Sequence, residues 1–416
     1  MKQLLSLLSL LLLSSLCVTA QPVPRELSHY SFIRYEDNDL RYSDTSSSLK
    51  TFFRKWRRME ATGQGNLNIV HIGGSHVQAG TMSNTIRCNL LQAYPTLVGG
   101  RGMLFPYSAA ARCNNPRDYR VHCPQKVILT RNIYKEHSCP LGLCGIAVTA
   151  ADSLTEIQMV MSEPRVDYAT NRVVILGHSD EGVVPYLGIG GRHVYPSYVA
   201  RSTDRYVFNL STTVDSFSVF LPCKDGERFS LTGILLDNRH AGFSFHSIGV
   251  NGAAVPDYLR CQNFVRDLRM LHPDMVIFGI GINDANATDF DTADFRANYL
   301  ALVDSIRTIN PDCAFIFITN NDSFRRKRRR RYEVNRNGLL AREVFYRLAD
   351  NTGGAVWDQF EVMGGLKSME KWFKNKLAQK DRVHFTVAGY QLVGDLFTNA
   401  LFDAYNQYTK TLTHNR

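Results

Sequence analysis

Residues 67–76 read LNIVHIGGSH, an apolar run that passes directly into two glycines, a serine and a histidine. A short apolar run bounded by glycine is typical of a buried parallel strand. The pattern returns at 275–280 and 314–318, and a helical segment follows each run. Strands that alternate with helices in this way predict a parallel sheet covered by helices on both faces. The helices are expected at 82–94, 291–309, 337–349 and 386–405, with a further short strand at 355–357.

The middle of the chain, from about 105 to 245, has a different pattern. Short β-rich runs alternate there with turn residues, and no long amphipathic helix intervenes. This is typical of an antiparallel sandwich. We therefore predict an α/β domain formed by 21–104 and 246–416, and an inserted β-sandwich at 105–245 that is a candidate carbohydrate-binding unit. The β-rich runs lie at 126–130, 172–176, 206–210 and 217–221.

The first twenty residues indicate export. Lys2 precedes the apolar run 4–16, and Val18-Thr19-Ala20 offers the small residues that a signal peptidase reads. An uncleaved anchor is the alternative, but the run is too short to span a membrane comfortably. We predict a cleaved signal peptide at 1–20 and a periplasmic or secreted mature protein without stable membrane insertion.

Eight cysteines remain after that cleavage, and an even number permits disulfides in an oxidising compartment. Four of them cluster between 113 and 144 beside His122, so a zinc site is the alternative. No CxxC spacing occurs, and disulfides or unpaired buried thiols are therefore preferred. The eight are Cys88, Cys113, Cys123, Cys139, Cys144, Cys223, Cys261 and Cys313.

The net charge of +10 is concentrated locally, because residues 325–331 read RRKRRRR. Such a run can mark nucleic-acid binding. Aromatic residues do not interleave it, and the protein is expected outside the cell. We therefore interpret the run as a solvated loop, or as a contact for an anionic cell-surface polymer. In the second case its charge could steer the polymer toward the site.

Three features lie where catalytic groups gather, after the carboxyl ends of strands. Ser75 follows its strand directly, although a lone serine there is commonly a helix N-cap. Asp381 and His384 precede the last helix, where the carboxylate can orient the imidazole that takes a proton from a serine. Asn283 follows the strand at 275–280 and can donate to an oxyanion, or simply close an Asx-turn.

This order of serine, asparagine and Asp–His pair resembles that of the SGNH/GDSL hydrolase superfamily. Residues 71–79, HIGGSHVQA, resemble the GDSHxQA block of exported peptidoglycan and polysaccharide O-acetylesterases. Gly99-Gly100-Arg101-Gly102 with Phe105-Pro106 resembles their GGRG…FP segment. Those enzymes carry a β-sandwich inserted after this segment, so the resemblance implies a flavodoxin-like SGNH domain with such an insert.

The resemblance also implies roles for individual residues. Ser75, His384 and Asp381 would form the catalytic triad, and Asn283 would contribute to the oxyanion hole. Residues 247–253, SIGVNGA, fit the place of the family's glycine block. Gly252 is then expected in the oxyanion hole, with Gly249 as the alternative. His76 would contact substrate at the mouth of the site or pack the loop, and no metal or organic cofactor is required.

The sequence departs from the family at Gly74, where the GDS block has Asp. In the family that Asp supports the loop, so activity is expected to survive with an altered rate. The chain also lacks a GxSxG elbow because Val77 occupies its last position, which disfavours an ordinary α/β-hydrolase. The sequence thus predicts an exported esterase that removes acyl groups, most simply acetyl, from peptidoglycan or another polysaccharide. The alternatives are a glycan-binding protein on the same scaffold and a glycan O-acetyltransferase.

Overall fold

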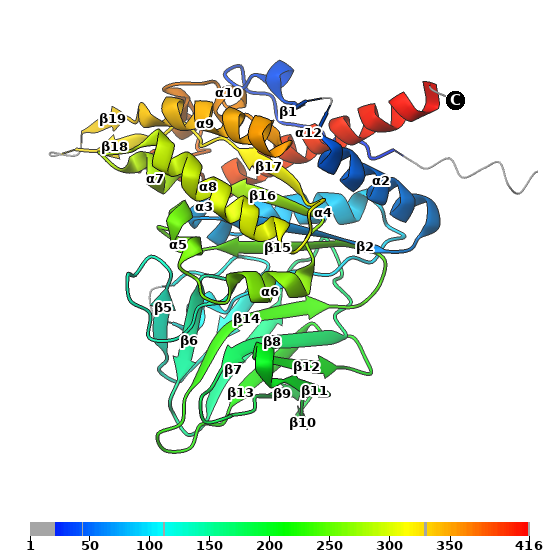
Figure 1. The fold of residues 1–416 in the computed structure, drawn as a ribbon, viewed down its shortest axis with the longest axis vertical. Helices are drawn as coiled ribbons and strands as arrows, with labels where there is room; N and C mark the ends of the chain where they lie inside the picture. Colours follow the sequence, from blue (N-terminus) through cyan, green and yellow to red (C-terminus); the bar gives the residue numbers. More distant parts are fainter. Residues whose placement is uncertain (1–20, 44, 111–112, 328–330, 415–416) are drawn as a thin grey trace, which may run out of the picture.

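The computed structural model describes residues 21–43, 45–110, 113–327 and 331–414, so the predicted signal peptide lies outside the described residues. The upper part of the molecule is built on a six-stranded sheet in the order β1-β20-β17-β16-β2-β15 (Figure 1). Neighbouring strands from β15 to β20 are parallel, and β1 pairs antiparallel with β20. The strands are β1 (Leu40–Tyr42), β2 (Asn66–Gly73), β15 (Gly242–Gly249), β16 (Met275–Gly279), β17 (Ala314–Ile318) and β20 (Ala355–Trp357).

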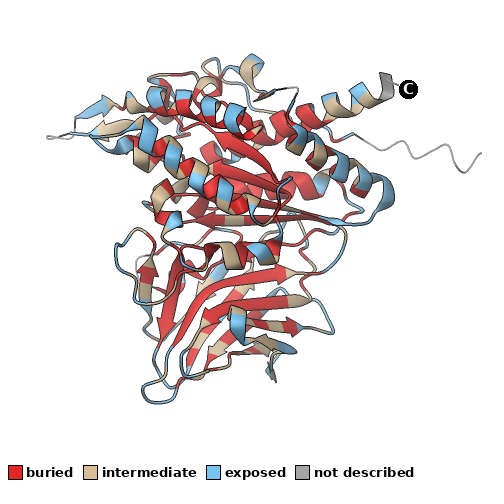
Figure 2. Ribbon diagram, in the orientation of Figure 1, coloured by how far each residue is buried: buried red, intermediate tan, exposed pale blue. Residues whose placement is uncertain are grey.

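Helices cover both faces of this sheet because successive strand side chains alternate between the faces. Ile69 and Ile277 pack in one core with α2 (Ser47–Thr62), α4 (Thr81–Ala93) and α12 (Val387–His414). Their neighbours Val70 and Val276 lie in the other core, with α8 (Thr292–Arg307) and α9 (Asn337–Thr352). Figure 2 shows the result, with buried strands between helices whose outer surfaces are exposed. The remaining helices are α3 (Ser75–Gln78), α5 (Val255–Leu259), α6 (Phe264–Leu271), α7 (Ile282–Asn286), α10 (Gln359–Val362) and α11 (Ser368–Lys374), with short 3-10 turns at 35–37, 107–109 and 201–203.

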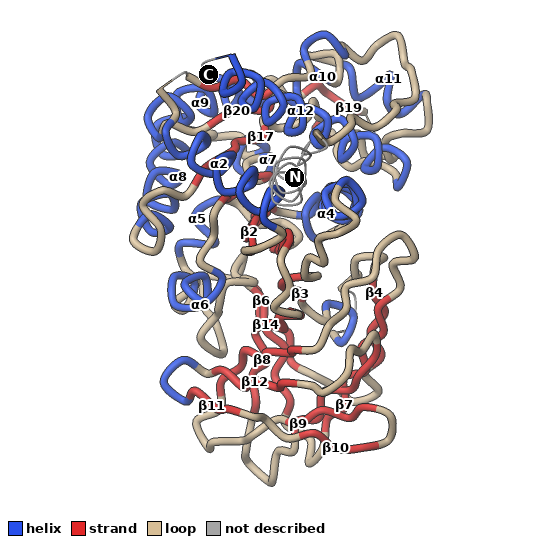
Figure 3. The backbone as a smooth tube through the Cα atoms, turned by 90° about the vertical axis from the view of Figure 1, so that its right-hand side faces the viewer, coloured by secondary structure: helices blue, strands red, loops and turns tan. Residues whose placement is uncertain are grey.

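Two antiparallel sheets form the lower part of the molecule (Figure 3). One has the order β11-β12-β8-β14-β6-β5 with β3 added to β14, and the other has the order β10-β9-β13-β7-β4. The predicted fold class is therefore confirmed: an α/β domain with a parallel sheet and additional antiparallel sheets. The first sheet contains β3 (Gly102–Leu104), β5 (Ile128–Arg131), β6 (Ile146–Ala150), β8 (Arg172–His178), β11 (Tyr198–Ala200), β12 (Arg205–Asn209) and β14 (Phe229–Asp237). The second contains β4 (Tyr119–His122), β7 (Thr155–Met161), β9 (Tyr186–Ile189), β10 (Arg192–Val194) and β13 (Ser216–Leu221).

The chain passes between the two parts at β3 and again between β14 and β15. β3 pairs with β14 in the antiparallel sheet, whereas β15 pairs along its whole length with β2. The division of sheets therefore falls a few residues before the boundaries at 104 and 245 expected from the sequence. The two-domain organisation itself remains a prediction.

A buried ion cluster joins the two parts. The carboxylate of Asp118, just before β4, lies 2.8 Å from Arg101 Nη2 and 3.4 Å from Arg87 Nη1 of α4. All three side chains are almost completely buried. Arg87 also donates to the Phe245 carbonyl and to Ser247 Oγ of β15. The cluster thus links α4, the edge of the parallel sheet and the antiparallel part.

The cysteines have free thiols, which corresponds to the second of the two preferred alternatives. All eight cysteines of the described chain are unpaired, and six of them are buried. Along the described residues, the search for a helix long and apolar enough to cross a bilayer found none.

Replacing Asp118 by Asn should strongly destabilise the fold. The change keeps the shape of the side chain but leaves two buried guanidinium groups without a counter-charge, at a cost of about 3–5 kcal/mol. Urea denaturation of both proteins would measure the difference in unfolding free energy. Asp180→Asn is the control, because the Asp180 side chain is 86% exposed. If both changes lowered the free energy of unfolding only slightly, Asp118 would not be a buried counter-charge that stabilises the fold.

Candidate active site

Three adjacent strands end in glycine at the same level of the parallel sheet. Gly73 of β2 pairs in register with Gly249 of β15 and with Gly279 of β16. A Cβ atom on Gly73 would lie 2.2 Å from Val77 Cγ2, and one on Gly249 would lie 2.3 Å from Gln78 N. Side chains at these positions would therefore push α3 off the sheet. The glycines allow the chain after each strand to turn closely over the sheet edge.

Those turns bring the predicted catalytic groups together. Ser75 begins α3 immediately after β2, and His384 and Asp381 lie in the loop before α12. Ser75 Oγ is 2.8 Å from His384 Nε2, and His384 Nδ1 is 2.7 Å from Asp381 Oδ2. The side chains of His384 and Asp381 remain 32% and 46% exposed. The three groups thus form a continuous hydrogen-bonded row that a bulky substrate can reach.

Asp381 fixes the orientation of the imidazole. Its Oδ1 accepts hydrogen bonds from the backbone N–H groups of Val383 and His384, at 2.9 and 3.0 Å. Partial burial alone would raise the pKa of Asp381, but the hydrogen bonds from the His384 ring and backbone lower this pKa to about 2. An ionised Asp381 can only accept, so His384 Nδ1 carries the proton. Nε2 is then the acceptor for the Ser75 hydroxyl.

The expected oxyanion groups lie in the turns that follow β2, β15 and β16. The backbone N–H groups of Ser75 and Gly252 have no hydrogen-bond partner in the described part of the chain. Asn283, in the first turn of α7, donates through Nδ2 to the Ala253 carbonyl oxygen at 2.9 Å. Its amide therefore lies against the turn that contains Gly252. Gly249, the alternative, instead ends β15 against α3.

Gly74 has a structural consequence at this point. A Cβ atom at position 74 would lie 3.2 Å from Asn283 Nδ2 and 3.3 Å from the Ala253 carbonyl oxygen. The glycine therefore lets the Asn283 amide approach the serine turn without an intervening side chain. An Asp at this position, as in the family block, would require the amide or the turn to shift by a few tenths of an ångström.

Four residues to which the sequence analysis gave no role hold the turns in place. Gln78 Oε1 accepts a hydrogen bond from Asn251 N at 2.7 Å, which fixes the turn before Gly252. The other three contacts are Tyr107 OH to the Gly249 carbonyl (2.7 Å), Tyr258 OH to the Gly73 carbonyl (2.8 Å), and Val255 N to the Asp284 carboxylate (3.1 Å). Gln78 and Tyr107 do lie within or beside the quoted HIGGSHVQA and FP segments. The sequence marked their neighbourhood but not their function.

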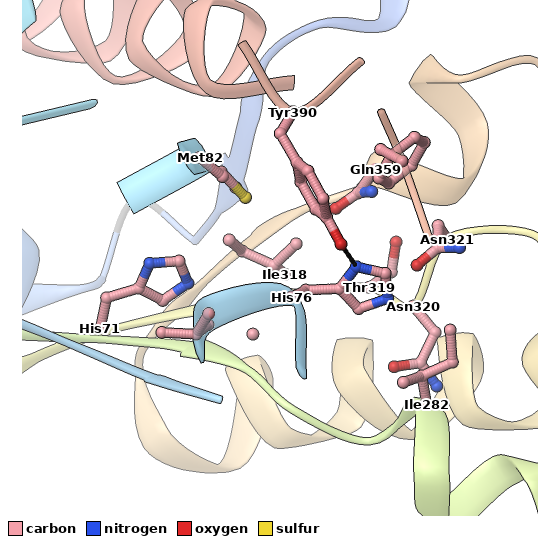
Figure 4. A pocket seen from close by; sticks show the side chains of 13 residues that line it. His71, His76, Met82, Ile282, Ile318, Thr319, Asn320, Asn321, Gln359 and Tyr390 are labelled. Carbon is pink, nitrogen blue, oxygen red and sulfur yellow. Dashed lines mark hydrogen bonds between the residues drawn. The ribbon is translucent and has the colours of Figure 1, made fainter. Parts of the chain in front are cut away.

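His76 lines a cavity (Figure 4). Its Nδ1 is 2.8 Å from the Tyr390 hydroxyl, and its ring centre is 5.2 Å from that of His384. Burial, reinforced by His384 and partly opposed by Asp381, lowers the pKa of His76 to about 3, so the ring is neutral. Nε2 is buried without a partner among the described residues and lines the cavity with Thr319 and Asn320. Contact between His76 and substrate remains a prediction.

Comparison with known proteins finds a family model and solved structures that are similar to this chain. Residues 223–392 match the family model of the GDSL-like lipase/acylhydrolase family. The chain carries a GDSL-like lipase/acylhydrolase domain. The matched region contains Asn283, Asp381 and His384, whereas the antiparallel strands separate it from Ser75. The expected resemblance to the SGNH hydrolase superfamily is therefore confirmed.

Among solved structures, a peptidoglycan O-acetylesterase is similar at a TM-score of 0.73 and 19% identity. The match covers 88% of this chain and 99% of that protein, so the GDSL-like domain and the antiparallel part share its fold. The acetyl xylan esterase AlAXEase is 21% identical, with a TM-score of 0.30 and coverage of 37% and 79%. A GDSL-like lipase from Bacteroides thetaiotaomicron is 17% identical, with a TM-score of 0.30 and coverage of 40% and 76%. The search of curated proteins found no match.

Asp381→Asn should lower kcat of ester hydrolysis by about 10²- to 10⁴-fold. The amide retains an oxygen for the backbone N–H groups, but its NH₂ faces the proton on His384 Nδ1 and disfavours the required tautomer. Steady-state hydrolysis of an aryl acetate would measure the effect. Asp350→Asn, at an exposed position of α9, is the matched control. An unchanged kcat in Asp381→Asn would remove this residue from the triad.

Asn283→Ala should lower kcat by about 10²- to 10³-fold while leaving KM nearly unchanged. In its expected role, Asn283 would donate to charge that develops only during attack on the ester. Asn286→Ala, at an exposed position of the same short helix, serves as the control. A rise in KM at constant kcat would instead assign Asn283 to ground-state binding.

Proposed function

We propose that the protein is an exported serine esterase that removes O-acetyl groups from peptidoglycan or another polysaccharide. The observation that carries the proposal is the hydrogen-bonded row from Ser75 Oγ through His384 to Asp381. Ser75 and His384 are 309 positions apart in the sequence, so their hydrogen bond does not follow from proximity along the chain. The GDSL-like family match supports ester hydrolysis, and the name of the similar peptidoglycan O-acetylesterase supports a glycan substrate.

In the first step, Ser75 Oγ attacks the carbonyl carbon of the ester while His384 Nε2 accepts the serine proton. Asp381 stabilises the imidazolium that forms. The negative oxygen of the tetrahedral intermediate lies near the Ser75 and Gly252 N–H groups and the Asn283 amide. The intermediate expels the sugar oxygen, which takes the proton from His384, and an acetyl group remains on Ser75.

A water molecule completes the reaction. His384 removes its proton as the water oxygen attacks the acetyl-enzyme, and the same donors stabilise the second intermediate. The second intermediate then breaks its bond to Ser75 Oγ. The serine oxygen takes a proton back from His384, and acetate is released. The side chains and backbone of this chain supply every group that these two steps require.

The exposure of the site favours an acyl group carried on a polymer. His384 and Asp381 keep 32% and 46% of their side-chain surface accessible. An acetyl group on a sugar ring can therefore reach Ser75 without burial of the whole ligand. A long-chain lipid ester would instead need an extended apolar groove leading to the serine.

Acetate release from O-acetylated peptidoglycan and O-acetylated xylan tests the proposal. Wild-type protein should release acetate from at least one substrate, and Ser75→Ala should abolish release. Ser305→Ala, on the distant helix α8, should behave as wild type. Adding an unacetylated glycan acceptor separates transfer from hydrolysis, because a transferase would move the acetyl group to the acceptor. If neither glycan nor a small aryl acetate is hydrolysed, the esterase proposal fails and a glycan-binding protein is favoured.

A further inference from the structure

Two segments separated by thirty residues in the sequence hold the positive charge of this protein. Residues 324–336 contain eight basic residues and one acidic residue, and residues 367–384 contain six basic and two acidic residues. Together they have eleven more basic than acidic residues, whereas the excess for the whole chain is ten. The remainder of the protein is therefore close to neutral. Its charge is a local feature and not a general property of the surface.

The fold brings the two segments side by side at Arg382. The guanidinium of Arg382 lies 4.8 Å from the ring centre of Tyr332 in β19 (Tyr332–Val334) and 3.7 Å from that of Phe373 in α11. Its carbonyl accepts a hydrogen bond from Phe324 N of β18 (Phe324–Arg326) at 3.1 Å. In Figure 3, β19 and α11 accordingly lie at the same end of the upper part.

The junction is also part of the catalytic loop. Arg382 lies between Asp381 and His384 in the chain, so the hairpin β18–β19 and helix α11 border the catalytic pair. Arg325 further ties the hairpin to helix α7, which contains Asn283, by donating to the carbonyls of Ala285 and Ala287, each at 2.9 Å. The basic segments thus attach to both sides of the site.

Most cations of these segments are available to a ligand. Eight exposed cations of these segments have no acidic partner among the described residues, and we call them the basic face. By contrast, Arg382 is paired with Glu370, and Lys327 with Glu333. The basic face consists of Arg326, Arg331, Arg336, Lys367, Lys371, Lys374, Lys376 and Lys380.

We propose that the basic face binds the carboxylate or phosphate groups of a polyanionic glycan and presents its ester groups to Ser75. The inference rests on the proposed esterase function and adds that the preferred substrate is an anionic acylated polysaccharide. Exposed positive charges beside a site raise the local concentration of an anionic ligand. Nucleic acid is disfavoured because single strands are held by stacking on free aromatic faces. Tyr332 beside the basic face is 37% exposed, and Arg382 covers one face of its ring.

A charge-neutralised variant tests this inference. In the basic-face variant, Arg326, Arg331, Lys374 and Lys376 are replaced by Gln. The matched control replaces four exposed cations elsewhere, on α2 and in the antiparallel part, and so has the same net charge. Those control positions are Arg54, Arg58, Arg192 and Lys224.

Three esters are compared at low salt and at about 1 M salt, where the screening length is ~3 Å. They are acetylated polygalacturonate, an acetylated uncharged xylo-oligosaccharide and an aryl acetate. For polygalacturonate, kcat/KM should fall about tenfold or more in the basic-face variant and in high salt, but not in the control. Hydrolysis of the two neutral esters should be unchanged. Equal loss in the control, or an equal salt response with all three esters, would overturn the inference.

Binding is measured separately in Ser75→Ala, by affinity electrophoresis in gels that contain polygalacturonate or a polyglycerol phosphate. Retardation that disappears when the basic-face changes are added would support the inference even if the esterase proposal failed. Retardation by one polymer alone identifies carboxylate or phosphate as the group recognised. Unchanged retardation would overturn the inference and leave the esterase proposal intact. Stronger binding to single-stranded DNA than to both glycan polymers would also overturn it.

Discussion

The site depends on the close contact between the sheet edge and the chain that turns over it. Gly73, Gly249 and Gly279 end three neighbouring parallel strands in register, and α3 packs directly on this row. Because no Cβ atom intervenes, the segments after β2, β15 and β16 stay within hydrogen-bonding distance of one another. The serine, the expected oxyanion glycine and the asparagine each follow one of these strands within a few residues. Close contacts between the backbones at these strand ends therefore position Ser75, Gly252 and Asn283.

Charge within the site is arranged around the short loop before α12. Asp381 faces His384, accepts three hydrogen bonds and remains ionised because its pKa is lowered to about 2. Its neighbour Arg382 points toward aromatic rings of β19 and α11. One turn thus orients the His384 imidazole and anchors the segments that hold most of the protein's positive charge. In our proposal, chemistry and attraction of the substrate are coupled through this turn.

The antiparallel part also contributes to the site, although it supplies none of the proposed catalytic groups. The segment that leads into it provides Tyr107, whose hydroxyl binds the last carbonyl of β15. The return from β14 to β15 places the second glycine strand at the edge of the parallel sheet. The buried cluster of Arg87, Arg101 and Asp118 then joins the two parts. The position of the Gly252 turn therefore depends on how the insert leaves and re-enters the sheet.

The sequence by itself determined the alternating α/β pattern, the β-rich middle and the identity of the catalytic candidates. These are local properties: apolar runs, glycine turns and short motifs such as the Asp–His pair are legible without knowledge of long-range contacts. The contacts of Gln78 with Asn251, the environment of His76 and the meeting of the two basic segments at Arg382 were decided only by the tertiary structure. They join residues up to several hundred positions apart, or depend on which way one side chain points. The spacing of apolar residues indicates whether a segment is a helix or a strand. Packing against other elements decides where each side chain points and which group it contacts.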